Sequence, residues 1–133
     1  MIFIDSGALV ARFIQRDQHH MKAAAIWEDL VNGTERCCTS NIVLSETLTL
    51  LARRTAYDFA ARQAKAIYSS HVLEIIRPTA KDEATAVLLF QKYAEHKVSF
   101  CDCISFALMQ ARNIETAFTF DKHFSLAGFR TCP

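Results

Sequence analysis

The chain is poor in the residues that build tight turns and covalent scaffolds. Its 133 residues include only three glycines and two prolines, and its five cysteines form no C-x-x-C pair. So few turn-forming residues argue against an all-β fold rich in tight turns and against flexible linkers. An odd number of cysteines without a scaffold pattern argues against a disulfide framework and a zinc site. We therefore expect reduced, mostly buried thiols.

The sequence also lacks a long apolar run. No stretch approaches the roughly 18 consecutive apolar residues of a membrane span, and the N-terminus has neither a basic region nor a small-residue cleavage site. We therefore expect a cytoplasmic protein that does not associate with membranes. The net charge of +1 gives no sign of nucleic-acid binding, although a local basic patch can lie beside an acidic site.

What is present is a large apolar fraction, arranged in short runs. With 51 % apolar residues the chain can form one core, so we expect a single domain over residues 1–133. Strands are predicted over 1–4, 35–39, 72–76 and 116–120, with a weak one over 129–132. Helical patterns lie between them, over about 8–14, 21–31, 42–54, 55–69, 79–96 and 102–111.

Strands that alternate with helices predict an α/β fold, a three-layer α/β/α sandwich around a mostly parallel sheet of four or five strands. The first strand has no polar alternation, which is typical of a strand buried on both faces, and we expect it in the middle of the sheet. Candidate helix caps are Ser6, Asp17 and Ser40, and two stretches, Thr55–Asp58 and Thr79–Asp82, fit a capping box.

Four acidic residues are out of place on this plan. Asp5 and Asp121 each follow an apolar strand, where an ordinary loop or helix-capping aspartate is the alternative. Glu46 lies on the apolar stripe of its helix, unless a salt bridge with Arg53 or Arg54 or a tilted helix accounts for it. Asp102 opens the helix over 102–111, where it could also be an N-cap. We call Asp5, Glu46, Asp102 and Asp121 the four site carboxylates.

Topology can bring the four site carboxylates to one edge of the sheet. In a right-handed crossover, a helix starts at the edge where its strand ended, and ligand sites form outside the carboxyl ends of parallel strands. The arrangement requires the helix over 79–96 to return Asp102 to that edge.

Such a cluster repels itself unless a cation compensates it. Carboxylates without histidine or cysteine favour Mg²⁺ or Mn²⁺, which can supply a deprotonated water to attack a phosphodiester. Hydroxyls close in sequence could orient a carboxylate or a water, and they are those of Ser6, Ser99 and Thr119. The neighbouring His19 and His20 are expected on the surface, and His123 is expected in a loop, with substrate contact as the alternative.

The order and spacing of these motifs along the chain resemble those of PIN-domain nucleases, specifically the small VapC-type toxin ribonucleases. The resemblance runs nearly end to end and rests on Asp5-Ser6, a helix carrying Glu46, Ser99-Phe100-Cys101-Asp102, and Thr119-Phe120-Asp121-Lys122-His123-Phe124. Gly7 departs from it, because a small polar or apolar residue is commoner there.

The resemblance implies a metal-dependent endoribonuclease whose four site carboxylates bind the metal. It also implies RNA as the substrate, a homodimer, and a cognate antitoxin that lies in an apolar groove. Phe13, Trp27 and Tyr57 are candidates to line that groove or a dimer face. Lys122 and several arginines are candidates to contact RNA phosphates.

Two other classes of function remain open on the sequence. One is a PIN-like binding module that has lost catalysis, against which the presence of all four site carboxylates argues. The other is a haloacid-dehalogenase-type Mg²⁺ phosphohydrolase, which also has an aspartate after its first strand. That family places a second aspartate two residues later, where this chain has Gly7.

Overall fold

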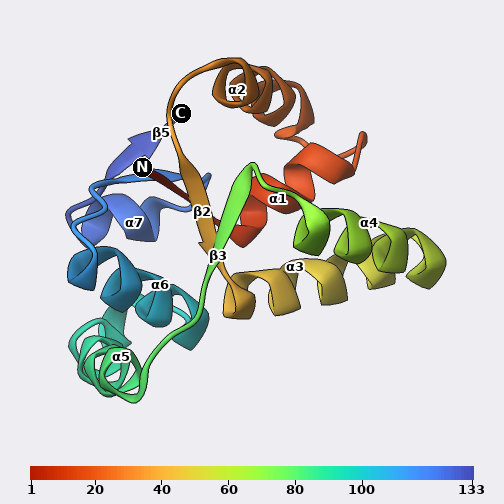
Figure 1. The fold of residues 1–133 in the computed structure, drawn as a ribbon. Coiled ribbons are helices and arrows are strands. Elements are labelled where there is room, and N and C mark those ends of the chain that lie inside the picture. The colour runs from red at the N-terminus through yellow and green to blue at the C-terminus, as the bar shows by residue number, and fades with distance from the viewer.

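A parallel sheet with the strand order β3-β2-β1-β4-β5 runs through the middle of the molecule (Figure 1). The structure is a computed structural model that describes residues 1–133. The strands are β1 (Ile2–Ile4), β2 (Cys37–Ser40), β3 (Leu73–Ile76), β4 (Thr116–Phe118) and β5 (Arg130–Cys132). All four pairings are parallel, and β1 is the central strand, as predicted.

Helices connect every pair of consecutive strands. They are α1 (Ser6–Phe13), α2 (His20–Asn32), α3 (Asn41–Arg54), α4 (Tyr57–Ser69), α5 (Ala80–Lys92), the 3₁₀ turn η1 (Ala94–His96), α6 (Phe100–Ala111) and α7 (Lys122–Leu126). The chain steps outward from β1 to β2 and β3, and then returns past β1 to β4 and β5. Because parallel crossovers are right-handed, this reversal places the helices on both faces of the sheet.

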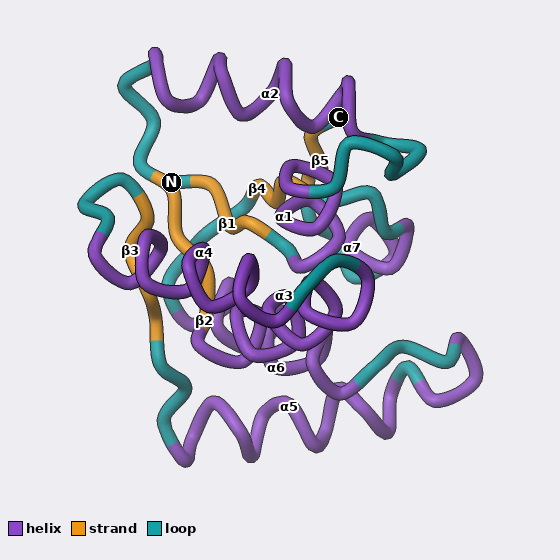
Figure 2. Tube along the Cα trace, turned by 90° about the vertical axis from the view of Figure 1, so that its right-hand side faces the viewer, coloured by secondary structure: helices purple, strands orange, loops and turns teal.

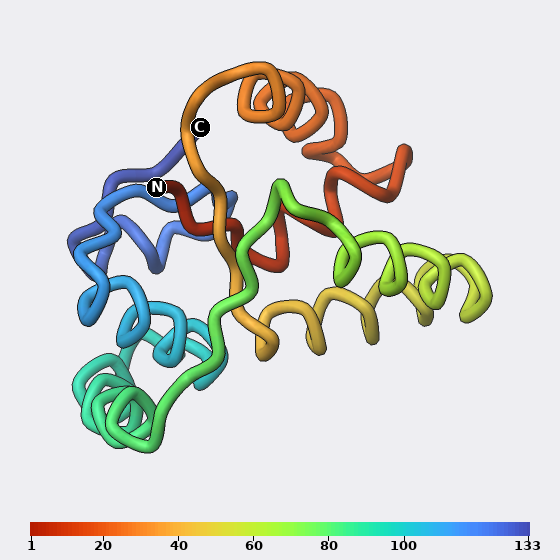
Figure 3. Tube along the Cα trace, in the orientation of Figure 1, coloured from red at the N-terminus to blue at the C-terminus, as the bar shows by residue number.

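The views agree with this three-layer arrangement. Helices α2 and α5 lie on opposite sides of the sheet in Figure 1 and again after the quarter turn of Figure 2. Helix α1 packs on α2 and α3, whereas α5 packs on α6. The trace in Figure 3 shows α3 and α4 running side by side as a helical pair. The predicted α/β/α sandwich with a parallel sheet is confirmed.

The core forms where the sheet meets its helices. Phe3 and Ile4 of β1 are fully buried, as are Ala117 and Phe118 of β4. The parallel register pairs Ile4 with Phe118, so the two strands end side by side. The residues that follow them therefore emerge together at one edge of the sheet. No helix in the structure combines the length and the apolarity that crossing a bilayer requires.

Several predicted helix starts are wrong by a few residues. Asp5, not Ser6, caps α1, because its carboxylate accepts the Ser6 amide hydrogen. Helix α2 begins at His20 after an N-cap at His19, and Asp17 accepts the His19 amide one turn earlier. The capping box at Thr79–Asp82 is present with both reciprocal hydrogen bonds.

The capping box predicted at Thr55–Asp58 does not form. Thr55 is the C-cap of α3, and its hydroxyl donates to the Leu51 carbonyl at 2.6 Å. A threonine between two helices can bond to either, and here the preceding helix uses it. The strand predicted over 116–120 also ends early, at Phe118, because Thr119 turns toward β1.

Candidate metal centre

Asp5 leaves β1 at the point where the direction of the chain through the sheet reverses. Its amide donates to the Phe118 carbonyl at 3.0 Å, which joins the ends of β1 and β4. Its two carboxylate oxygens then have separate partners, the Ser6 amide at 2.7 Å and the Thr119 hydroxyl at 2.8 Å. The side chain is only 4 % exposed. Asp5 is thus both a helix cap, the ordinary alternative, and a fixed carboxylate at the sheet edge.

Thr119 connects two of the site carboxylates. While its hydroxyl donates to Asp5, the same oxygen accepts the Asp121 amide at 3.0 Å. Asp121 in turn caps α7, and its Oδ1 accepts the His123 amide at 2.8 Å. The ends of β1 and β4 are therefore held in one hydrogen-bonded chain, with both carboxylates at the same edge.

Asp102 enters from the other side of the sheet. Ser99, not Asp102, is the N-cap of α6, and its hydroxyl accepts the Asp102 amide at 3.1 Å. Asp102 is buried in the first turn, where the helix dipole favours a negative charge. Its carboxylate makes no hydrogen bond within the chain. The helix cap is thus supplied by Ser99, and the aspartate side chain is left for another partner.

Glu46 lies half-buried in the second turn of α3. The salt bridge considered with Arg53 or Arg54 does not form, because Arg54 pairs with Asp17 at 3.4 Å. The contact Glu46 does make is with the Cys101 thiol, whose sulfur lies 3.5 Å from Oε2. Burial, with Glu46 and Asp102 adjacent, raises the pKa of this thiol, so it stays protonated and can donate.

All four site carboxylates line one open cleft of about 590 Å³. The other lining residues are Ser6, Gly7, Lys97, Ser99, Phe120, Lys122 and His123. Of the three supporting hydroxyls, Ser6 and Ser99 face the cleft directly, whereas Thr119 is buried behind Asp5. The structure therefore brings together the four carboxylates that the sequence predicts to lie at one edge of the sheet.

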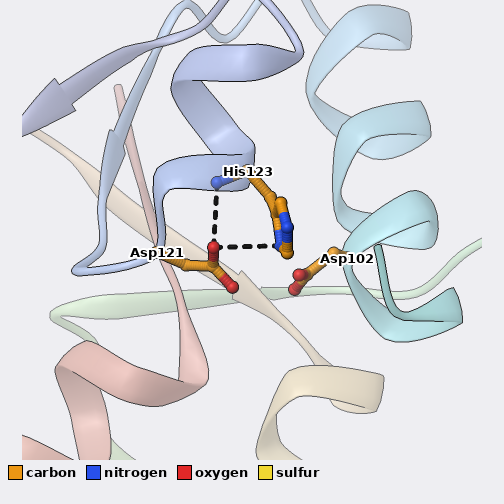
Figure 4. Close-up of side chains that lie close together, drawn as sticks. All are labelled: Asp102, Asp121 and His123. Atoms are coloured by element: carbon orange, nitrogen blue, oxygen red, sulfur yellow. Dashed lines mark hydrogen bonds and ion pairs between the residues drawn. The ribbon is translucent and has the colours of Figure 1, made fainter. Parts of the chain in front are cut away.

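His123 joins this group from helix α7, not from the loop in which the sequence predicts it. Its Nδ1 lies 3.1 Å from Asp121 Oδ1, and one potential ligand atom from each of His123, Asp121 and Asp102 lies within 4.8 Å of the others (Figure 4). The imidazole is positioned by α7, a five-residue helix that is too short to show a helical pattern in the sequence. The signal was present as an aspartate cap followed two residues later by His123 and then by the buried Phe124.

His19 and His20 lie partly on the surface, and each ring also makes a contact that the sequence does not predict. His20 is half-buried, and its Nδ1 lies 2.8 Å from the Ala11 carbonyl oxygen. His19 is also half-buried and stacks on Phe120. Each ring therefore has a defined partner, because the turn before α2 folds back over α1 and the β4–α7 turn.

The site carboxylates repel one another, because no lysine or arginine is paired with them. Burial, together with the charges of Asp121 and Glu46, raises the pKa of Asp5 to about 6, against the lowering effect of its hydrogen bonds to Thr119 and Ser6. Burial and the three other carboxylates raise the pKa of Asp102 to about 8. No arginine or lysine forms an ion pair with any site carboxylate.

A divalent cation fits this donor set. Oxygen ligands predominate, two of them are buried without a counter-charge, and a cation removes their mutual repulsion. The same ion would lower the pKa values that burial raises, since it stabilises the ionised form.

The five cysteines are all free, and three of them are buried, which matches the expectation of reduced thiols.

Comparison with known proteins places these features in a family. A model of the PIN domain matches residues 2–130. Two curated proteins from Mycobacterium tuberculosis strains, both called 23S rRNA-specific endonuclease VapC20, are 38 % identical over 129 residues, 97 % of this chain and 95 % of theirs.

Solved structures give the same picture. The crystal structure of Mycobacterium tuberculosis VapC20, described as a sarcin–ricin loop cleaving toxin, superposes with a TM-score of 0.88 at 36 % identity, covering 97 % of this chain and 96 % of that one. VapBC2 from Rickettsia felis, bound to a DNA fragment from its promoter, has a TM-score of 0.71 at 17 % identity, covering 99 % and 98 %. At that identity the second match speaks for the fold alone.

Proposed function

This chain belongs to the PIN domain family, and from that membership we propose that it is a metal-dependent endoribonuclease, the toxin of a type II toxin–antitoxin pair. The observation that carries the proposal is the convergence of four carboxylates from the end of β1, α3, α6 and the β4–α7 turn on one cleft, where none of them is paired with a lysine or arginine. A haloacid-dehalogenase mechanism has no support, because the side chain required two residues after Asp5 is absent at Gly7.

Asp5, Glu46, Asp102 and Asp121 would hold Mg²⁺ or Mn²⁺ in this proposal. When bound, the cation supplies Lewis-acid activation of water and neutralises charge on the phosphodiester. Side chains of the protein position the proposed metal ligands. Thr119 fixes the orientation of Asp5, and Ser99 fixes the first turn of α6 on which Asp102 lies. Outer partners of this kind set ligand geometry and are costly to remove.

The proposed substrate follows from the similarity to VapC20. We propose that this chain cleaves 23S rRNA in the sarcin–ricin loop, as that relative is described to do. Two lysines lie among the acids of the cleft, where they can offset the charge of a bound RNA strand. Lys97 and Lys122 line the cleft, both exposed and neither in an ion pair, and either can contact phosphates beside the scissile one.

Two protein partners belong to the same proposal. An antitoxin segment would lie in the hollow of about 520 Å³ between the end of α1 and the start of α4, which Phe13, Ile14 and Phe59 line. Arg16 at its rim offers a charge to an acidic segment. A homodimer would bury exposed apolar side chains of α5 and α6, namely Val87, Leu88, Phe90 and Phe100. Of the groove candidates, Trp27 instead packs against the core.

The test is cleavage of a hairpin RNA that carries the sarcin–ricin loop, by wild type and by Asp5→Asn, with Mn²⁺, with Mg²⁺ and with EDTA. Asparagine caps helices as well as aspartate does, so Asp5→Asn should keep α1 while it removes the charge and the acceptor of the Thr119 hydroxyl. We expect wild type to cut at one position with either metal. EDTA should abolish the cut, and Asp5→Asn should lower the rate by at least about a hundredfold.

Equal cleavage by the two proteins would refute the proposed site. Cleavage that survives EDTA would refute its metal. Titration of Mn²⁺ into each protein tests the alternative of an inactive binding module. Such a module would neither cleave the RNA nor bind Mn²⁺.

A further inference from the structure

Phe120 is the one hydrophobic residue among the eleven that line the acidic cleft. It lies in the β4–α7 turn, directly before Asp121. Its half-buried ring packs partly on the main core and meets Phe118 edge-on, with the ring centroids 6.0 Å apart. Core packing explains the buried part of the ring. It does not explain why the accessible part lines a cleft whose other residues are polar, charged or glycine.

A second ring supports Phe120. The imidazole of His19 stacks on it with a centroid separation of 4.2 Å and an angle of 5° between the planes. His19 does not itself line the cleft. Its backbone amide is held by Asp17 at 2.9 Å, and Asp17 is paired with Arg54. Segments far apart in the chain thus cooperate to hold one aromatic ring in place beside the site carboxylates.

We propose that Phe120, supported by His19, is a stacking platform for a nucleobase next to the cleaved phosphodiester. This inference rests on the proposed ribonuclease function and specifies how its substrate is held. Bases of single-stranded and loop RNA are splayed out and stack on aromatic side chains. Since Phe120 adjoins Asp121, a base on its ring belongs to a nucleotide that flanks the phosphate at the carboxylates.

The surroundings favour a base over an amino-acid side chain as the occupant. Lys97 and Lys122 share the cleft with Phe120 and are free to contact phosphates on either side of the scissile one. A strand of RNA presents phosphates and π-faces alternately, which matches this mixture of cations and a single ring. Phe120 is therefore a positioning residue, and the carboxylates remain the groups that act on the phosphodiester.

The test pairs a change in the protein with a change in the RNA. Phe120→Leu removes the ring and keeps apolar volume, Phe120→Tyr restores a ring, and Tyr68→Leu removes an exposed ring outside this cleft as the control. The probes are the sarcin–ricin loop hairpin and two copies with an abasic residue on one or the other side of the mapped cut. For each protein we would measure kcat/KM on all three RNAs, the affinity for Mn²⁺ and the midpoint of thermal unfolding.

We expect Phe120→Leu to lower kcat/KM by about tenfold, mainly through KM, while Phe120→Tyr and Tyr68→Leu stay near wild type. Wild type should lose about tenfold on one of the two abasic substrates, and Phe120→Leu should lose nothing further on it. Mn²⁺ affinity should be the same in all four proteins. A smaller loss is expected for His19→Gln, which leaves Phe120 in place without its stacked partner.

The inference is overturned if Phe120→Leu cleaves as well as wild type, or if it remains equally sensitive to the abasic residue. Should Phe120→Leu unfold, the first criterion is applied to His19→Gln, and cleavage by His19→Gln equal to that by wild type overturns the inference. A wild type that cleaves no RNA at all would overturn the proposed function and the platform together, whereas normal cleavage with an insensitive Phe120 would overturn the platform alone.

Discussion

Thr119 donates a hydrogen bond of 2.8 Å to Asp5 across 114 residues of sequence, and both side chains are buried. The bond fixes which carboxylate oxygen is directed away from the helix cap. It also makes Thr119 the only contact between the side chain of Asp5 and the β4–α7 turn among the hydrogen bonds of the structure.

Removing that hydroxyl should weaken metal binding while the fold remains. Thr119→Val keeps the shape of the side chain but leaves Asp5 Oδ2 and the Asp121 amide without their partner. We expect a loss of about 10–100-fold in Mn²⁺ affinity or cleavage rate. Thr119→Ser should keep most of both. Thr131→Val, on neighbouring β5 and outside the cleft, is the matched control, and an equal effect there would contradict the role of Thr119.

Proton release from the cleft should destabilise the metal-free protein. The pKa values of Asp5 and Asp102 rise on folding from an ordinary 3.8 to about 6 and about 8. Both groups bind protons more tightly in the folded state, so their contribution to stability is fully present below pH 3.8. It is lost as the pH rises through 6 and 8.

Thermal unfolding in EDTA between pH 5 and 9 measures this loss. Wild type should lose more stability over that range than Asp102→Asn, which has no carboxyl to ionise there. Mn²⁺ should reverse the loss, with an affinity that increases by up to about tenfold per pH unit for each proton displaced. Parallel curves for the two proteins would show that Asp102 does not carry the effect.

The two cleft lysines should contribute through charge. Lys97→Ala or Lys122→Ala removes a cation that lines the cleft without an ion pair. Each should raise KM for the hairpin several-fold and flatten the dependence of log KM on log salt by about 0.7. Lys81→Ala, exposed at the start of α5 and absent from the cleft, should change neither. An unchanged salt slope in both variants would exclude these phosphate contacts.

Two threonines with similar sequence surroundings should differ in their effect on stability. Thr79 caps α5 and completes the reciprocal hydrogen bonds with Asp82, so Thr79→Ala should cost about 1 kcal/mol in the free energy of unfolding. Thr55 caps no following helix, and Thr55→Ala should change stability by about 0.5 kcal/mol or less. Urea denaturation of both variants decides, and an equal loss would contradict the assignment of the two caps.

How far the sequence could predict the structure depended on the length of the pattern. The apolar run before Asp5 is typical of a strand in the centre of a parallel sheet, and β1 is there. The order of strands then brought Asp5 and Asp121 to one edge without further information. Glu46 was recognisable because a carboxylate on an apolar stripe is unusual.

What the sequence could not predict were contacts made by short elements. Helix α7 is too short to show a helical period, so the approach of His123 to Asp121 was not foreseen. The stack of His19 on Phe120 depends on how two turns meet in space, which no local pattern encodes. Thr55 shows the limit of capping rules, since the same hydroxyl can serve the helix before it or the helix after it.

The pairing of β1 with β4 has a consequence for the time at which the protein becomes active. Three of the site carboxylates are present once residue 102 has been synthesised, but Asp121 and its partner Thr119 come later and reach Asp5 only when β4 docks beside β1. Contacts between such distant segments require the closure of a long loop, which slows folding. The cluster of four carboxylates is therefore complete only once β4 has docked beside β1, and a chain cut before residue 116 would hold three of them at most.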